Sequence, residues 1–159
     1  MSTRSTCKAI VINDGKILLN KCHDEHYGKY YSLPGGGQET DEFLTDAIIR
    51  EVLEETGYTV VPDRFVGLGE EICMNEEMRK AYPSYIHKMY HIFLCHLGNV
   101  DKKEPTEIDQ MQDGIVWLPL EEAFHAPIKP EMVKVNLDKM INSGHPMFLD
   151  SVRIEYHHG

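Results

Sequence analysis

Short stretches in which apolar residues alternate with polar ones or follow one another directly indicate β-strands along most of the chain. We predict strands over residues 7–13, 17–22, 30–33, 115–118 and 148–156, with one or two more over 58–70, broken at Pro62-Asp63. The turn signal Asn13-Asp14-Gly15-Lys16 predicts that the first two form a hairpin. Residues 85–97 are apolar on both faces, so we expect this strand in the centre of the sheet.

Helical spacing of apolar residues appears in two longer stretches. The first begins at Thr40 or Asp41, either of which is a suitable N-cap, runs to about Glu55 and stops at Gly57. The second covers residues 129–142, with Gly144 as its stop. A short helix is also expected to start within 120–125, and residues 71–84 are expected to be a loop or a short helix. Strands combined with separated helices predict a layered α/β domain.

The composition narrows the classes of partner. The chain has 159 residues, near the usual size of one domain, so we expect a single domain over residues 1–159. The formal net charge is -10, which argues against a nucleic-acid polymer or an anionic membrane as the main partner. No apolar run approaches the ~18 residues of a membrane helix, and residues 1–7 lack a signal-peptide core. A cytoplasmic location is therefore expected.

Three carboxylates share one face of the first predicted helix. At ~100° per residue, Glu54 and Glu55 lie on either side of Glu51. Apolar residues flank the acids on both sides, whereas an ordinary surface helix separates its acids from its apolar stripe. Like charges this close repel one another and are tolerated best when cations neutralise them. An oxygen-only ligand set favours Mg²⁺ or Mn²⁺. On spacing alone, a solvated acidic face is the alternative.

The same helix belongs to a longer pattern of fixed spacing. The pattern is Gly36, five residues, Glu42, seven residues, and then the run Arg50-Glu51-Val52-Leu53-Glu54-Glu55-Thr56-Gly57-Tyr58. This pattern resembles the signature of the Nudix hydrolase family, and seven of its fixed positions match. A chance match at those positions is on the order of one in 10^8 to 10^9 per starting point. Tyr58 is a mild departure, because an aliphatic residue is usual there.

The resemblance implies a fold, an activity and a set of site residues. The implied fold is a Nudix-like α/β/α sandwich with a mixed β-sheet between helices. The implied activity is metal-dependent hydrolysis of a phosphoanhydride in a nucleoside diphosphate linked to another moiety: a nucleotide sugar such as ADP-ribose, a dinucleoside polyphosphate or a nucleoside triphosphate. Glu54 and Glu55 would be the principal metal ligands with the carbonyl of Gly35. Glu51 would be a ligand or the base, and Arg50 would orient the glutamates.

Other expectations concern the substrate and the assembly. A small nucleotide-type substrate would contact Gly36 and Gly37, and His87 and Tyr30 are further candidates because a histidine and an aromatic face suit a nucleotide. Glycines allow the backbone to bend sharply and to approach a ligand closely. Dimers are frequent among Nudix proteins, so a homodimer is one expected state.

One departure from the family affects the base. Many members supply a further acid just before the later tryptophan strand, but here the stretch reads Glu107-Ile108-Asp109-Gln110-Met111-Gln112-Asp113. Asp109, Glu107, Glu70 and Glu71 are the alternatives. A second class of function is a Nudix-like module that senses a nucleotide without hydrolysing it. Such modules commonly lose a signature carboxylate, and this chain keeps them all. Isomerisation of an allylic diphosphate on the same fold is a third alternative.

Overall fold

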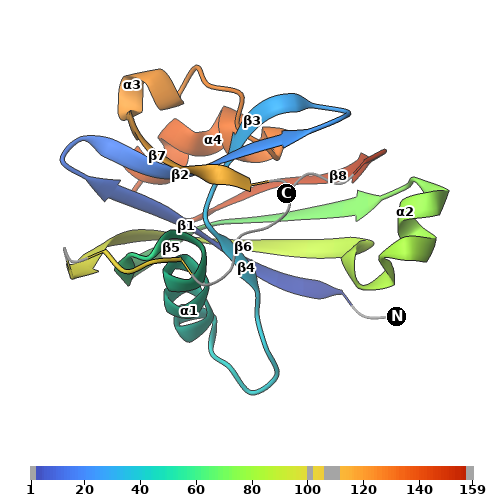
Figure 1. Cartoon of the computed structure of the whole chain (residues 1–159), viewed down its shortest axis with the longest axis horizontal. Coiled ribbons are helices and arrows are strands. Elements are labelled where there is room, and N and C mark those ends of the chain that lie inside the picture. The colour runs from blue at the N-terminus through green and yellow to red at the C-terminus, as the bar shows by residue number, and fades with distance from the viewer. Residues whose placement is uncertain (1–2, 100–101, 106–111, 157–159) are drawn as a thin grey trace.

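A computed structural model of the chain describes residues 3–99, 102–105 and 112–156, and every element below lies in these ranges (Figure 1). Its strands are β1 (Arg4–Asn13), β2 (Lys16–Asp24), β3 (Gly28–Ser32), β4 (Gly35–Gly37), β5 (Thr59–Cys73), β6 (His87–Asn99), β7 (Gln112–Pro119) and β8 (Met147–Ile154). Its helices are α1 (Leu44–Thr56), α2 (Glu76–Ala81), α3 (Leu120–Ala123) and α4 (Glu131–Asn142), with a 3-10 turn, η1, at Pro83–Tyr85.

The strands form a mixed sheet in the order β3-β2-β1-β6-β5-β8, while β4 pairs with β1 and β7 pairs with β2. The β1–β6 and β5–β8 pairs are parallel and the others are antiparallel. The predicted hairpin of β1 and β2 is confirmed, with Asn13 opposite Lys16. The predicted central strand is also confirmed, because β6 lies between β1 and β5.

Two apolar cores lie on opposite faces of the sheet, and β1 contributes to both. Ile10 belongs to the core that includes Leu137 of α4. Val11, the next residue, belongs to the core that includes Val52 of α1. Successive side chains of a strand point to opposite faces, so this alternation places α1 and α4 on opposite sides of the sheet (Figure 1). The expected sandwich of helices around a mixed sheet is therefore confirmed.

Helix α1 begins later than the sequence predicts. Its N-cap is Phe43, whose side chain makes no capping bond, so the prediction of Thr40 or Asp41 as the cap is wrong. Asp41 has a left-handed φ of 64°, which is incompatible with the start of a right-handed helix. The other end agrees with the prediction, because Gly57 adopts φ 80° and its N–H donates to the carbonyl of Leu53.

Several strand and loop boundaries also differ. The expected break at Pro62-Asp63 is wrong, because β5 continues through it and absorbs the proline as a register shift between Pro62 and Arg64. The three glycines before α1, expected as a bend, form the short strand β4. Helix α4 has Ser143 as its C-cap, one residue before the expected stop. Among the described helices, none has the length and apolar character required to cross a membrane.

Candidate active site

Arg50 is the centre of a charged cluster on α1. Its Nε and Nη2 donate to the two carboxylate oxygens of Glu42 at 2.8 and 3.0 Å. Its Nη1 donates to Glu51 at 2.9 Å and to Glu54 at 3.2 Å. Nη2 also donates to the carbonyl of Gly37 at 2.9 Å. One guanidinium therefore holds three glutamates of the signature and the strand in front of the helix.

Electrostatics follow from this geometry. Hydrogen bonds from Arg50, and secondarily from the Glu39 N–H, lower the pKa of Glu42 to about 2. The same bond to Glu42 raises the pKa of Arg50, so the guanidinium stays charged. The side chains of Glu51 and Glu54 are only 14% and 25% exposed, so the contacts with Arg50 are weakly screened by solvent.

Glu55 has a different environment from its two neighbours on the helix face. One of its oxygens accepts from the N–H of Gly35 at 2.6 Å, and the other accepts from Asn20 Nδ2 at 3.5 Å. Burial raises the pKa of Glu55 to about 7, and the charge of Glu51 adds to this effect. The charge of Lys8 and the bond from Gly35 oppose the rise without cancelling it. Burial is therefore the main reason that Glu55 holds its proton more tightly than an exposed glutamate does.

Glycine is required in β4 because this strand lies very close to the Glu51 side chain and to the backbone of β1. A Cβ on Gly36 would lie 2.5 Å from Cδ of Glu51, and a Cβ on Gly35 would lie 2.9 Å from the backbone carbonyl carbon of Cys7. Gly35 also has φ 146°, which other residues rarely adopt. The absence of side chains lets β4 pair with β1 on one edge while the Gly35 N–H and the Gly37 carbonyl contact α1 side chains on the other.

A chain of amide side chains, which the sequence analysis missed, leads to Glu55. Gln112 Nε2 donates to Asn20 Oδ1 at 3.0 Å, and Asn20 in turn donates to Glu55. Gln112 lies in the stretch where a further acid was expected, so an amide occupies part of that region. No signal in the sequence links Asn20, Glu55 and Gln112, because the three residues belong to separate elements, β2, α1 and β7.

Comparisons with known proteins give the family. A family model described as the NUDIX domain matches residues 3–138. The chain belongs to the Nudix family. A NUDIX hydrolase from Nitrosomonas europaea superposes with a TM-score of 0.68 at 21% identity, covering 92% of this chain and 94% of that one. This likeness shows that the two proteins share a fold.

Two curated relatives are similar over different lengths. The nucleoside triphosphatase NudI of Escherichia fergusonii is 28% identical over 122 residues, or 74% of this chain and 83% of that protein. The ADP-ribose pyrophosphatase of Methanocaldococcus jannaschii is 42% identical over 48 residues, or 30% of this chain. That second match spans 28% of the archaeal protein, less than a third of its length.

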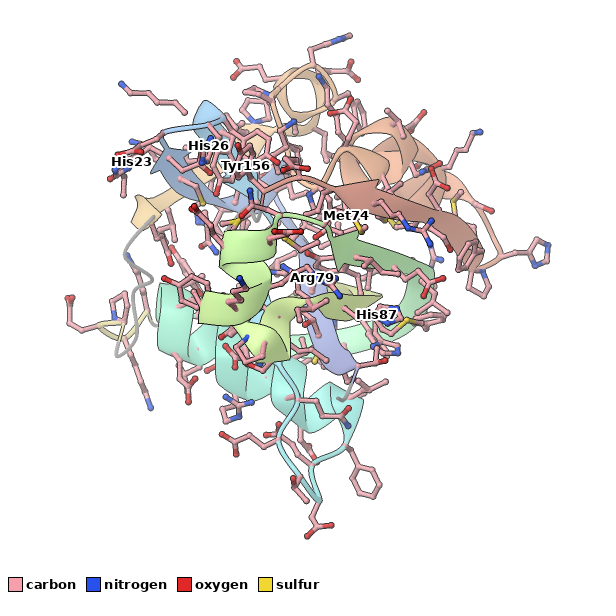
Figure 2. The ribbon with its side chains drawn as sticks, turned by 90° about the vertical axis from the view of Figure 1, so that its right-hand side faces the viewer. His23, His26, Met74, Arg79, His87 and Tyr156 are labelled. Atoms are coloured by element: carbon pink, nitrogen blue, oxygen red, sulfur yellow. The ribbon has the colours of Figure 1, made fainter. Side chains whose placement is uncertain are left out.

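Some residues considered for the site lie apart from the Nudix glutamates. His87, which is labelled in Figure 2, forms a hydrogen bond between its Nε2 and a carboxylate oxygen of Glu70 at 2.9 Å. Glu70 also accepts from the hydroxyl of Ser151 at 2.6 Å, so this acid is engaged by the edge strand β8. Tyr30 is 2% exposed and packs edge-on against Tyr27. Glu107 and Asp109 lie outside the described residues.

The carboxylate and carbonyl oxygens of the Nudix signature are of the chemical type that binds a hard divalent cation. Among the described residues, no three His, Cys, Asp or Glu side chains are arranged to hold a metal ion, since Arg50 engages Glu51 and Glu54. Three signature carboxylates nevertheless share a single arginine, and Glu55 lies on α1 beside two of them, with a pKa raised mainly by its burial and further by the charge of Glu51. Carboxylate and carbonyl oxygens are the ligands that Mg²⁺ and Mn²⁺ prefer.

A pH dependence of stability follows for the metal-free protein. The folded pKa of Glu55 is about 7 and its ordinary value is 4.5. The folded state therefore holds this proton more tightly than the unfolded state, so stability falls as the pH rises from about 4.5 to about 7. Denaturant unfolding in chelator should show this fall in the native protein and a smaller one in Glu55→Gln. Parallel pH profiles of the two proteins would contradict the assignment.

Proposed function

We propose that this Nudix chain, as a single domain over residues 1–159, is a metal-dependent pyrophosphohydrolase. Its reaction is the hydrolysis of a phosphoanhydride in a nucleoside diphosphate linked to another moiety. The observation that carries the proposal is the group of four signature glutamates, three of them bonded to Arg50 and the fourth, Glu55, bonded to Gly35, packed against a strand of three glycines. Such a group is costly for stability, because buried like charges repel one another, but it suits the binding of a cation and, through it, a diphosphate.

The proposed metal ligands are Glu51, Glu54, Glu55 and the carbonyl of Gly35, with Mg²⁺ or Mn²⁺ as the ion. In an antiparallel ladder the N–H and C=O of one residue point to the same side. The Gly35 N–H points to Glu55, so its carbonyl is expected to face α1 as well. When bound, the ion supplies Lewis-acid stabilisation of the charge that develops on the diphosphate oxygens.

The remaining site residues have proposed roles in positioning and proton transfer. Arg50 orients Glu51 and Glu54, because its Nη1 donates a hydrogen bond to each carboxylate. Glu51 or Glu54 accepts the proton of the attacking water, which requires an approach within about 3 Å. Gly36 and Gly37 offer bare backbone to the phosphates. We also propose Tyr30 and His87 as residues that contact the substrate. Tyr30 is buried, and His87 is the first residue of β6.

The relatives support a nucleotide as the substrate. One is named a nucleoside triphosphatase and another an ADP-ribose pyrophosphatase, so nucleoside triphosphates and nucleotide sugars such as ADP-ribose are candidate substrates. Dinucleoside polyphosphates are a third candidate, which comes from the Nudix signature. We further propose a cytoplasmic location, with no nucleic-acid polymer or membrane as partner, which the net charge of -10 favours. A homodimer is proposed from analogy with the family alone.

A substrate panel tests the proposal. Nucleoside triphosphates, ADP-ribose and dinucleoside polyphosphates are incubated with the protein and Mg²⁺, and the products are separated to show which anhydride breaks. We expect turnover of at least one compound with Mg²⁺ or Mn²⁺ and none with chelator. Tight nucleotide binding without turnover would favour the second function, a non-hydrolytic nucleotide-sensing module. Absence of both binding and turnover would remove the proposal.

A further inference from the structure

Three polar residues, Arg4, Thr6 and Lys8, form a row along β1 on the α4 side of the sheet. Side chains two residues apart on a strand share a face, and Ile10, the next member of the row, belongs to the apolar core on that side. The glycine strand β4 runs beside the row and pairs with β1 at Thr6 and Lys8. Since glycines carry no side chains, the row is bordered by bare backbone on its β4 flank.

The guanidinium of Arg4 is packed between two neighbours. Its Cζ lies 4.3 Å from the centroid of the Tyr85 ring in η1. Its Nη2 lies so close to Gly37 that a Cβ on this glycine would be 2.5 Å away. Gly37 is the residue opposite Thr6, so the guanidinium reaches the level of the Thr6 side chain. Among the described residues, none accepts a hydrogen bond from Arg4 or forms an ion pair with it, which leaves its planar fork of N–H donors for a ligand.

The two other members of the row also lack a bonding partner within the described ranges. The ammonium of Lys8 makes no hydrogen bond or ion pair there, although its charge acts on Glu55. Thr6 is 5% exposed, and its Oγ1 is buried without a hydrogen-bond partner. A buried hydroxyl without a partner is costly, and a ligand that hydrogen-bonds to it removes that cost.

Positive charge gathers on this face although the chain is acidic overall. Arg4 lies directly opposite Lys88 of β6, and like charges in that arrangement repel each other. Burial is the main cause that lowers the pKa of Lys88 to about 8, and the charges of Lys8 and Arg4 lower it further against the opposing charge of Glu71. Glu71 already lies 3.7 Å from the Lys88 ammonium. Three cations on one face, in a chain of net charge -10, favour an anion as the ligand of the row.

The row and the signature glutamates lie on opposite faces of the sheet, with β4 between them. Among the described strands, β4 pairs only with β1, so the two faces meet at its other edge. Lys8 is opposite Gly35, whose N–H donates from that edge to Glu55 at 2.6 Å. The backbone of Lys8 is therefore about one strand spacing, ~4.8 Å, and one hydrogen bond from the Glu55 carboxylate. A ligand held by the row can extend over Gly35 to the proposed metal site.

We propose that Arg4, Thr6 and Lys8 bind a phosphate group. A guanidinium binds two phosphate oxygens at once, and a hydroxyl and an ammonium each donate to a further oxygen. Lys8 is about 7 Å from Thr6 along the strand, within the reach of a lysine side chain. Two sources have this chemistry: the terminal phosphate of a substrate whose inner phosphates lie at the glutamates, and free inorganic phosphate. Only the first source rests on the proposed function.

The test uses equilibrium binding without hydrolysis. Inorganic pyrophosphate is titrated by calorimetry into the metal-free protein in chelator. We expect saturable binding that weakens about tenfold in Arg4→Gln and in Lys8→Met, because each variant loses a hydrogen bond to a charged group. Lys16→Met is the matched control: Lys16 is an exposed lysine at the start of β2, and its variant should bind as the native protein does.

Thr6→Val distinguishes binding from a structural role. Valine keeps the shape of threonine but lacks the hydroxyl, so the affinity for pyrophosphate should fall. The unfolding temperature should stay at or above the native value, because the unpartnered hydroxyl is removed from the interior. Absence of saturable binding by the native protein, or native affinity in the variants of Arg4, Thr6 and Lys8 alike, would overturn the inference.

Titrations of ATP and ADP-ribose identify the source of the phosphate. Both ligands contain adenosine diphosphate, and they differ in the group beyond it, a phosphate in ATP and a ribose in ADP-ribose. If the row holds a substrate phosphate, Lys8→Met weakens ATP binding in chelator about tenfold and leaves ADP-ribose binding unchanged. If it holds free phosphate, Lys8→Met weakens pyrophosphate binding alone. Either pattern supports the phosphate site. Neither depends on turnover, so failure of the proposed hydrolysis would be seen separately in the substrate panel.

Discussion

Glu54→Gln is expected to lower kcat by about 100-fold or more while the folded protein stays close to native stability. The substitution removes one negative charge from the proposed metal ligands but keeps the size of the side chain. The amide oxygen of glutamine can still accept the bond that Arg50 Nη1 now donates to Glu54 at 3.2 Å. The loss should therefore appear in turnover at saturating Mg²⁺ and hardly at all in thermal unfolding.

A matched control separates this effect from a general loss of charge. Glu77 is an exposed residue of α2, and Glu77→Gln removes the same charge away from α1. Its kcat should equal that of the native protein. If Glu54→Gln retained kcat within a factor of two of the native value, Glu54 would have no part in the chemistry and the site assignment would fail.

Arg50→Lys should be the second most damaging change, lowering kcat/KM by about 100-fold because misplaced catalytic groups lose that much. Lysine keeps the positive charge but lacks the planar fork. Arg50 now makes five hydrogen bonds, to Glu42, Glu51, Glu54 and the Gly37 carbonyl, and a single ammonium cannot match their directions. The variant should also unfold at a lower temperature, because partly buried carboxylates lose their partners.

Two measurements distinguish positioning from a loss of fold. Arg79→Lys on α2 removes another guanidinium, one that donates to the carbonyl of Cys73 at 2.8 Å, and it should leave kcat/KM unchanged. Proton titration of Glu42 by NMR should show its pKa rising from about 2 towards the ordinary 4.5 in Arg50→Lys. Native kcat/KM together with an unchanged Glu42 pKa would show that Arg50 does not organise the cluster.

The periodicity of the sequence predicts most elements because it records local burial. The two apolar faces of β6 and the Gly57 stop of α1 are read directly from side-chain order. The start of α1 was mispredicted because Asp41 adopts a left-handed conformation that no propensity signals. Strand β4 was missed because glycines disfavour strands in general, and it is their close approach to Cys7, Glu51 and Arg4 that requires glycine at these positions.

The sequence by itself determined the family, the sandwich of helices and mixed sheet, and the alignment of Glu51, Glu54 and Glu55 on one helix face. These features depend on spacing within short segments, where helix and strand geometry is the same in every protein. Only the tertiary structure decided that Arg50 gathers three glutamates, that Asn20 and Gly35 hold Glu55, and that Arg4 packs against Gly37. These contacts join segments far apart in the chain, and their partners are set by how the sheet and helices pack.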